Sequence, residues 1–227
     1  NFVYQNGGEI LNEDGTKAEY TEKATSDAIK FYVNLQNNDW CPTQEQFANT
    51  SATEQFFSGQ GAMFFAGSWD LANLCSTYTD MNGKWDVAVL PKCPNPESGD
   101  GRAVISNSVS YATAAEGKNK DTAMDFLKFL ASEEGQRIQG ESGVAIPAYN
   151  GLEDTWVNTF AENGYDIHPE NIIPMFDYSV KYVNNPSRPS WEPKVEQAVL
   201  DIYAGNMSVD DGIQNMQDIV TEAIAEE

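Results

Sequence analysis

The 227-residue chain is long enough to bury a sizeable core, either as one large domain or as two modest lobes. Its 35 acidic and 13 basic residues give a formal net charge of −22, which argues against nucleic acid as a partner, because phosphate binding needs clustered Lys and Arg. The same balance argues against anionic ligands as a class and predicts a solvated acidic surface.

The first part of the chain is predicted to be mainly helical, after an opening turn at Gly7 and Gly8, where glycine tolerates backbone angles that other residues avoid. An amphipathic helix should run from Thr21, a capping residue, to about Asn37. The proline that follows cannot continue this helix. A second, short helix is expected at residues 51–57, which open with the spacing of a capping box.

A glycine-marked stretch at residues 56–69, FFSGQGAMFFAGSW, is the most informative segment. Residues 62–66 form a continuous apolar run that suits a strand covered on both faces. Gly67 should stop that strand, and Trp69 should open a helix that ends near Thr79. Because ligands of α/β proteins collect beyond the carboxyl ends of strands, Trp69 is a candidate ligand platform. The alternative is a core residue that wedges the helix against the sheet.

Strands and loops are predicted to alternate in the middle of the chain. Residues 85–90 have the pattern of a strand, and residues 91–101, with three prolines and two glycines, that of a flexible loop. Residues 102–105 and 109–114 are also strand-like. The polar residues between them are typical of a strand bulge or of a hinge.

The rest of the chain is predicted to be largely helical, with a mixed segment at residues 172–183 and a breaker loop before Trp191. The last helix starts with a capping box at Ser208, and Gly205 suits the position just after the preceding helix. The expected helices span residues 121–131, 133–141, 152–162, 191–205 and 208–225.

Four segments resemble, in the same order, one protein family. The stretch at residues 56–69 fits F-x-x-G-x-x-A-M followed by G-x-W, and residues 118–136 fit A-x-x-F-x-x-F-L-x-S-x-E. A G-x-x-x-P turn follows at residues 143–147, and Gly7-Gly8 precedes an acidic D-G turn. The chain is similar to the extracellular solute-binding proteins that serve ABC importers of sugars and oligosaccharides (family 1, maltose-binding-protein-like).

The resemblance implies an α/β fold of the type II periplasmic-binding-protein kind, helix-rich around a small mixed sheet, with the first lobe largely missing. Residues 1–105 would form the core of the second lobe. Residues 106–150 would cross the hinge and belong to the first lobe, and residues 151–227 would return to the second. An apolar face of the crossing segment would then be under-covered, which favours a dimer or a domain swap.

The resemblance also implies a location and partners. The intact protein would be extracellular or periplasmic, anchored to the membrane as a lipoprotein, and would deliver its ligand to a membrane permease. The chain opens without an export signal, so we expect that signal to have been removed or to lie upstream. No run approaches the ~20 apolar residues of a membrane-spanning helix.

Two tryptophans are expected to stack on sugar rings, because each follows a chain break and precedes a helix where the family places such aromatics. These are Trp69 and, less closely matched, Trp191. Asp70 follows the first and either hydrogen-bonds sugar hydroxyls or complements the helix dipole, which we favour. Arg188 precedes the second and either donates to a ligand oxygen or is a surface charge. The remaining tryptophans, Trp40, Trp85 and Trp156, are expected to lie in the core.

Four further residues complete the expected ligand-binding set. Gly7 and Gly8 line the cleft in the family, where a missing side chain admits a sugar, although they could simply let the chain turn. Asn107 and Ser108 lie at the family's hinge and are candidates to hydrogen-bond the ligand; the alternative is the strand bulge.

Catalytic chemistry is not expected. The single histidine, His168, comes without a G-x-S-x-G elbow, and there is no phosphate-binding loop. Cys41, Cys75 and Cys93 have no zinc-site spacing; one disulfide with a free thiol, or three buried thiols, are both open. We therefore expect a binding protein without metal or cofactor.

The sequence thus predicts the sugar-binding component of an ABC importer, present mainly as one lobe and therefore a weak binder in isolation. Three alternatives stay open. The same fold could bind a polyamine, a peptide or a metal complex; the chain could hydrolyse polysaccharide; or its aromatics could all be core residues of an interaction domain.

Overall fold

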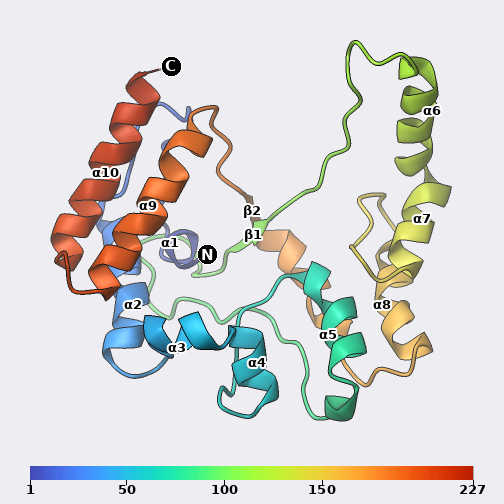
Figure 1. Ribbon diagram of the computed structural model, residues 1–227, viewed down its shortest axis with the longest axis horizontal. Coiled ribbons are helices and arrows are strands. Elements are labelled where there is room, and N and C mark those ends of the chain that lie inside the picture. Colours follow the sequence, from blue (N-terminus) through green and yellow to red (C-terminus); the bar gives the residue numbers. More distant parts are fainter. Residues whose placement is uncertain (227) are drawn as a thin grey trace. The chain divides into compact units, whose positions relative to one another are not determined.

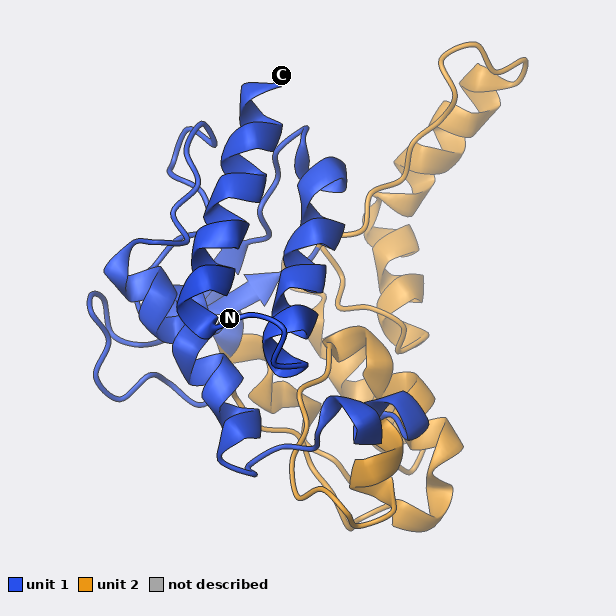
Figure 2. Ribbon diagram, turned by 60° about the vertical axis from the view of Figure 1, so that its left-hand side comes forward, with its two compact units in different colours: residues 1–51, 90–107, 175–227 blue, residues 52–89, 108–174 orange. Residues whose placement is uncertain are grey.

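The computed structural model describes residues 1–226 and divides into two compact units, each built from separate stretches of chain (Figure 2). Unit 1 comprises residues 1–51, 90–107 and 175–227, and unit 2 comprises residues 52–89 and 108–174. The chain therefore passes from one unit to the other after residues 51, 89, 107 and 174. The assignment of the chain to two lobes stays a prediction.

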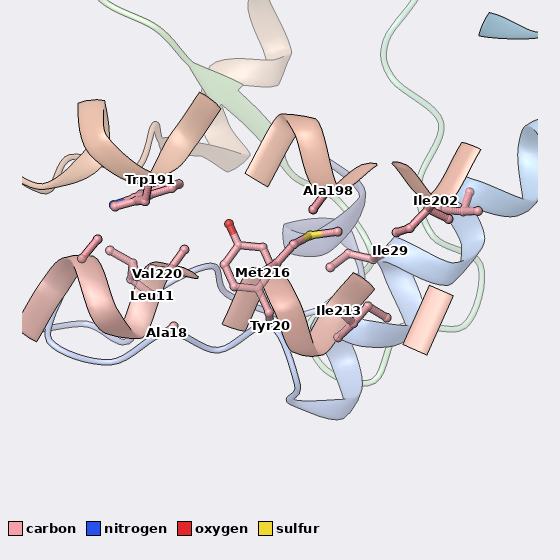
Figure 3. Packing of buried hydrophobic residues seen from close by; sticks show 12 residues of the cluster. Leu11, Ala18, Tyr20, Ile29, Trp191, Ala198, Ile202, Ile213, Met216 and Val220 are labelled. Carbon is pink, nitrogen blue, oxygen red and sulfur yellow. The ribbon is translucent and has the colours of Figure 1, made fainter. Parts of the chain in front are cut away.

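Unit 1 is built around two long helices, α9 (Arg188–Tyr203) and α10 (Val209–Ala225), which lie side by side (Figure 1). Figure 3 shows Trp191, Ala198 and Ile202 of α9 facing Ile213, Met216 and Val220 of α10. Met216 and Val220 are 1% and 0% exposed, and each buried side chain of this size contributes about 1.5–3 kcal/mol. The other helices of the unit are α1 (Phe2–Gln5), α2 (Lys23–Asn37) and α3 (Gln44–Asn49).

The ends of α9 and α10 confirm the predicted capping. The Ser208 hydroxyl accepts a hydrogen bond from the Asp211 backbone N–H at 3.1 Å, which satisfies one of the free donors at the start of α10. Gly205, directly after the cap of α9, has a φ of 73°. This left-handed conformation is strained for other residues, so glycine is the residue expected there.

The sheet of unit 1 consists of two short parallel strands, β1 (Val104–Ser106) and β2 (Ser179–Lys181). Val104 pairs with Ser179, and Ser106 with Lys181. The Asn1 side-chain oxygen accepts a hydrogen bond from the Ile105 N–H at 2.8 Å, so the chain start is tied to β1. The prediction of a small sheet is confirmed; its pairing is parallel, and a separate antiparallel bridge joins Leu11 to Ala18.

Unit 2 is helix-rich and packs around the buried residues Leu71, Cys75, Trp156, Phe160 and Ile167. Trp156 is fully buried, as predicted, and its indole N–H donates to the Gly143 carbonyl at 3.0 Å. The helices of the unit are α4 (Ala52–Phe57), α5 (Leu71–Thr77), α6 (Lys120–Leu130), α7 (Glu133–Glu141) and α8 (Glu153–Glu162). The short 3-10 turns are η1 (Ser68–Asp70), η2 (Thr79–Met81) and η3 (Pro169–Asn171), and η4 (Ile173–Tyr178) spans the end of the unit.

Three predicted strands are wrong: residues 62–66, 85–90 and 109–114 are irregular in the structure. Met63 is 90% exposed, whereas the strand covered on both faces that was predicted at residues 62–66 would bury it, and Val109 is 85% exposed. Strand backbone groups need a ladder partner, and within residues 1–226 no strand lies beside these segments. The sequence pattern thus identified apolar segments, but among the described residues they have no ladder partner.

The helix α3 was not predicted, although its start carries a local signal. The Thr43 hydroxyl accepts from the Gln46 N–H at 3.3 Å, and the Gln46 side chain accepts from the Thr43 N–H at 2.8 Å. This reciprocal pair is a capping box of the T-x-x-Q form. The expectation that the preceding Trp40 is a core residue is also wrong, because its side chain is 71% exposed.

The amphipathic helix α6 buries none of its residues within the described structure. Met124, Phe126 and Phe129 are 39%, 58% and 40% exposed, and the two phenylalanine rings stack with their centroids 6.5 Å apart. The sequence predicted this under-covered apolar face.

The three cysteines are free thiols in the structure. Cys75 is buried in unit 2, and burial raises the pKa of its thiol to about 11. Cys41 and Cys93 are partly exposed. Of the two possibilities that the sequence left open, the structure contains neither a disulfide nor three buried thiols. Among the described helices, none is long and apolar enough to cross a membrane.

Candidate functional site

One exposed aromatic residue of the predicted site, Trp69, lies in a turn of unit 2 together with Gly67 and Asp70. Trp69 lies in the turn η1, directly before α5, and its side chain is 54% exposed. A Cβ atom added to Gly67 would lie 2.2 Å from Cζ2 and 2.3 Å from Cε2 of the Trp69 indole. The ring therefore folds back over the Gly67 backbone, and only glycine leaves room for it.

Asp70 stabilises this corner locally. Its carboxylate Oδ2 accepts a hydrogen bond from the Gly67 N–H at 3.3 Å, and its own N–H donates to the Gly67 carbonyl at 3.0 Å. These two contacts close the turn that carries Trp69. The Asp70 residue is partly exposed.

The exposed indole is suited to one kind of chemistry. A large, flat, apolar face with a polar N–H at its edge matches ligands that present a face of C–H groups and polar groups at the rim. Because the ring rests on its own turn, it does not have to be ordered when a ligand stacks on it, which lowers the entropic cost of binding.

The space beside Gly7 and Gly8 in unit 1 is filled by protein. A Cβ atom on Gly7, whose φ is 77°, would lie 2.1 Å from the Ser98 hydroxyl. On Gly8 it would lie 2.6 Å from the Thr25 hydroxyl and 2.7 Å from the Thr25 backbone nitrogen. The structure thus places both glycines where the chain turns tightly against neighbouring backbone, which favours the structural alternative over a role in admitting a sugar.

Asn107 and Ser108 are exposed, and neither side chain hydrogen-bonds another residue of the described structure. They follow β1 directly, and the chain passes from unit 1 into unit 2 between them. Among the described residues, their side-chain polar groups are therefore without a hydrogen-bond partner at the point where the chain passes from unit 1 to unit 2.

Arg188, at the start of α9, is engaged within unit 1. Its Nη2 donates to Glu192 Oε1 at 2.9 Å, and its guanidinium carbon lies 3.9 Å from the centroid of the Tyr182 ring. The Tyr182 hydroxyl donates to the same Glu192 oxygen at 2.5 Å. Burial alone would raise the pKa of Glu192, but the hydrogen bonds from Tyr182 and Arg188 outweigh it and hold that pKa below its usual range. In this arrangement the Arg188 guanidinium is held by Glu192 and Tyr182 and is not a free donor for a ligand oxygen.

Trp191, one turn further along α9, is 4% exposed and belongs to the core of unit 1 (Figure 3). Its indole N–H is buried without an acceptor among the described residues. A ring sealed between two helices cannot offer its face to a ligand, so the structure does not present Trp191 as the expected stacking platform.

A group of residues that the sequence did not point to surrounds a shallow hollow of about 400 Å³ in unit 2. The lining residues are Gly83, Lys84, Trp85, Asp86, Asp166 and His168. The His168 Nδ1 lies 2.6 Å from Asp86 Oδ2, and the His168 backbone N–H donates to Asp86 Oδ1 at 2.7 Å. Since the two residues are 82 positions apart, no local pattern could have found this pair. No group of three or more metal-ligating side chains occurs within residues 1–226.

A family model described as bacterial extracellular solute-binding protein matches residues 1–137, more than half of the chain. The chain belongs to this family. The matched region of this solute-binding protein contains Trp69, Asp70, both glycines and the crossing residues Asn107 and Ser108, whereas Arg188, Trp191 and His168 lie outside it.

Known proteins similar to this solute-binding protein bind sugars according to their names. The diacetylchitobiose-binding protein DasA of Streptomyces coelicolor is 23% identical over 154 residues, which cover 67% of this chain and 36% of DasA. Among solved structures, an ABC substrate-binding protein of Listeria monocytogenes in complex with cycloalternan has a TM-score of 0.80 at 17% identity, and MalE of Xanthomonas citri has a TM-score of 0.76 at 19% identity. At this identity the structures establish the fold alone.

The chain is shorter than these relatives. Each of the two solved structures matches 99% of this chain, but the match covers only 55% of the relative. The chain thus spans about half the length of the solved relatives and about a third of the length of DasA. The helix-rich periplasmic-binding-protein-like fold that the sequence predicted is confirmed by these likenesses.

Proposed function

We propose that the chain is part of the sugar-binding component of an ABC importer, with an oligosaccharide or a small sugar as its ligand. Membership of the solute-binding family supports this proposal, and so do relatives whose names refer to diacetylchitobiose, cycloalternan and maltose. The intact protein would act outside the cytoplasm, anchored as a lipoprotein, and its protein partner would be the membrane permease of the importer.

The observation that carries the proposal is the exposed Trp69 ring on its glycine turn. Sugar rings have faces of C–H groups with hydroxyls at the edge, and an accessible indole matches such a face. A ring that is 54% exposed in an otherwise ordered turn is poor for core packing and good for stacking. Asp70, in the same unit as Trp69, would accept hydrogen bonds from hydroxyls, and Asn107 and Ser108 are separate candidates to hydrogen-bond the ligand.

The proposed mechanism is binding without chemistry. The family and its solved relatives are binding proteins. A ligand that touches both lobes of such a protein favours the closed state, and it shifts that equilibrium only by its differential affinity for the two states. Because the chain spans about half of the solved relatives, we expect it to offer only part of the ligand contacts when isolated.

Saturation-transfer NMR tests this function at the weak affinity expected of a partial site. Diacetylchitobiose and maltose at millimolar concentration should receive saturation from the chain, with a Kd on the order of 1 mM, which corresponds to about −4 kcal/mol. Trp69→Ala should abolish the transfer. Trp40→Ala, which removes an indole of similar or greater exposure in unit 1, should leave it unchanged.

Two further outcomes distinguish the alternatives. Transfer to spermidine in place of either sugar would support a cationic ligand on the same fold. Equal transfer to sugar from the parent chain and from Trp69→Ala would overturn the role of Trp69, and loss of transfer in both tryptophan variants would point to a non-specific aromatic effect.

The exposed apolar face of α6 supports a second proposal, that isolated chains associate through it. The stacked rings of Phe126 and Phe129, 58% and 40% exposed, are together unusual on a soluble surface. Sedimentation velocity at rising concentration should show dimers, and Phe126→Glu should shift the chain to monomers. A parent chain that stays monomeric up to about 100 μM would refute this; that concentration corresponds to about −5.5 kcal/mol of association energy.

A further inference from the structure

The two loops that surround the hollow of unit 2 are fastened to each other by several hydrogen bonds. At one end, the Asn82 side chain donates to the Gly164 carbonyl at 2.9 Å and accepts from the Asp166 N–H at 2.8 Å. At the other end, the Asn171 side chain donates to the Val87 carbonyl at 2.9 Å. Between these contacts lies the pair of Asp86 and His168, which is the only ionisable contact between the two loops within the described residues.

The Asp86 carboxylate has a double role in this fastening. Its Oδ1 accepts from two backbone N–H groups, that of Val87 at 2.8 Å and that of His168 at 2.7 Å. Its Oδ2 accepts from the imidazole Nδ1 at 2.6 Å. A carboxylate that receives three hydrogen bonds holds both loops at once, and the bond from a charged imidazole is the strongest of the three.

The fastened loops occupy a defined place along the chain. Residues 82–87 end shortly before the passage from unit 2 to unit 1 after residue 89, and residues 164–171 end shortly before the passage after residue 174. The contacts therefore join the two segments that carry the chain out of unit 2. A change in their strength would alter the freedom of both segments together.

The charges that face His168 are predominantly acidic. Asp86 is its hydrogen-bonded partner, Glu170 lies on the same loop, and Asp166 also acts on the imidazole. Lys84 lines the same hollow, but its ammonium group donates to the Asp80 carbonyl at 2.8 Å. The hydrogen bond to Asp86 and the charge of Asp86 raise the pKa of His168, with smaller contributions from Glu170 and Asp166.

We propose that Asp86 and His168 form a pH-dependent clasp that fastens the two segments leaving unit 2. Below the ordinary histidine pKa of about 6.5, the imidazolium and the carboxylate both carry charge and the clasp is closed. As pH rises through the raised pKa of His168 in the folded chain, the ionic contribution is lost. The hydrogen bond from the His168 backbone N–H to Asp86 persists at all these pH values. The contact between the two loops is therefore weakened but not lost.

The clasp can be measured directly, because His168 is the only histidine. Proton–nitrogen NMR of the imidazole on the parent chain gives one titration without ambiguity of assignment. We expect the pKa of His168 to lie above 6.5, and Asp86→Asn to bring it back toward that value. Asp166→Asn removes the same charge from the same hollow without removing the hydrogen-bonded partner, and it should lower the pKa of His168 less.

The same titration separates the clasp from the effect of the acidic chain as a whole. The net charge of −22 raises any histidine pKa somewhat at low ionic strength, and salt screens this contribution. In 0.5 M NaCl the difference between the parent chain and Asp86→Asn should persist, since the pair is in contact. If Asp86→Asn and Asp166→Asn lower the pKa equally, or if neither does, the proposal is overturned.

Hydrogen exchange tests the structural consequence. After correction for intrinsic exchange rates, the protection of the amides of Val87, Asp166 and His168 should fall several-fold between pH 5.5 and pH 8.5 in the parent chain. Amides in α10 should keep the same protection over this range and serve as the internal reference. His168→Gln should show low and pH-independent protection of both loops; protection that still varies with pH in this variant would overturn the proposal.

Discussion

Trp69 and Trp191 have the same local sequence setting but opposite environments in the structure. Each follows a break in the chain and stands at or near the start of a helix. The first is 54% exposed and rests on Gly67, whereas the second is 4% exposed and lies between α9 and α10. The difference comes from what packs on each helix from elsewhere in the chain. A tryptophan at a corner keeps an exposed ring only where no other element covers it.

The largest expected effect distinguishes the two tryptophans by stability. Trp191→Ala would leave a cavity in the core of unit 1 and should lower the free energy of unfolding by about 3–5 kcal/mol. Trp69→Ala removes an exposed ring and should change it by no more than about 0.5 kcal/mol. Urea denaturation followed by circular dichroism, with each transition fitted separately, measures both values.

Trp191→Phe sharpens this test. It keeps most of the apolar volume and deletes the indole N–H, which is buried without an acceptor. Because leaving such a donor unpaired costs about 1–3 kcal/mol, the lost volume should be largely offset, and Trp191→Phe should cost far less than Trp191→Ala. Equal costs for the two variants would mean that the ring is not packed as in Figure 3.

The second expected effect concerns the glycine beneath the exposed ring. Gly67→Ala places a Cβ atom about 2.2 Å from the Trp69 indole, so the exposed ring must leave its position, at a cost to the free energy of unfolding of no more than about 0.5 kcal/mol. We expect a shift in tryptophan emission and loss of saturation transfer to sugar. Gly61→Ala is the matched control, because its Cβ would meet nothing closer than 3.8 Å. An unchanged sugar signal in Gly67→Ala would contradict the stacking geometry.

Helices were predictable from the sequence to a greater extent than strands because their signals are local. The helix α7 matches the predicted 133–141 at both ends, and α10 begins at the predicted Ser208 cap. A strand at residues 62–66 depends on a ladder partner far away in sequence, and an apolar run does not reveal whether one exists. The exposure of Met63 is the consequence.

The candidate site shows the same contrast between local signals and contacts that are distant in sequence. The glycine–tryptophan corner was predictable, since Gly67 and Trp69 are two residues apart and the ring packs on its own turn. The burial of Trp191 depends on α10, which follows later in the chain. The Asp86–His168 pair depends on two loops 82 residues apart. Contacts between residues so far apart in the sequence depend on the fold and leave no spacing pattern in the sequence.

An effect on stability is expected from the network that precedes Trp191. Glu192→Gln removes the charged partner of Arg188 and Tyr182 and should lower the free energy of unfolding by about 1 kcal/mol at pH 7. Because the pKa of Glu192 is held below its usual range, this stabilisation is present above about pH 4.5 and is lost as pH falls through the lowered pKa. The difference between parent and variant should therefore shrink at low pH. Glu196→Gln, an exposed acid one turn later, should give no such pattern.

The smallest expected effect tests whether Asp70 only closes the turn beside the exposed ring or also binds the ligand. Its carboxylate accepts from the Gly67 N–H at 3.3 Å, and an amide oxygen can accept the same bond, so Asp70→Asn should leave stability within about 0.5 kcal/mol of the parent. Asp70→Ala loses the acceptor and should cost about 0.5–1 kcal/mol. If the residue only closes the turn, Asp70→Asn binds sugar like the parent chain. If the carboxylate also receives hydroxyl donors, Asp70→Asn weakens the saturation transfer while denaturation stays unchanged, and the charge itself then belongs to the ligand site.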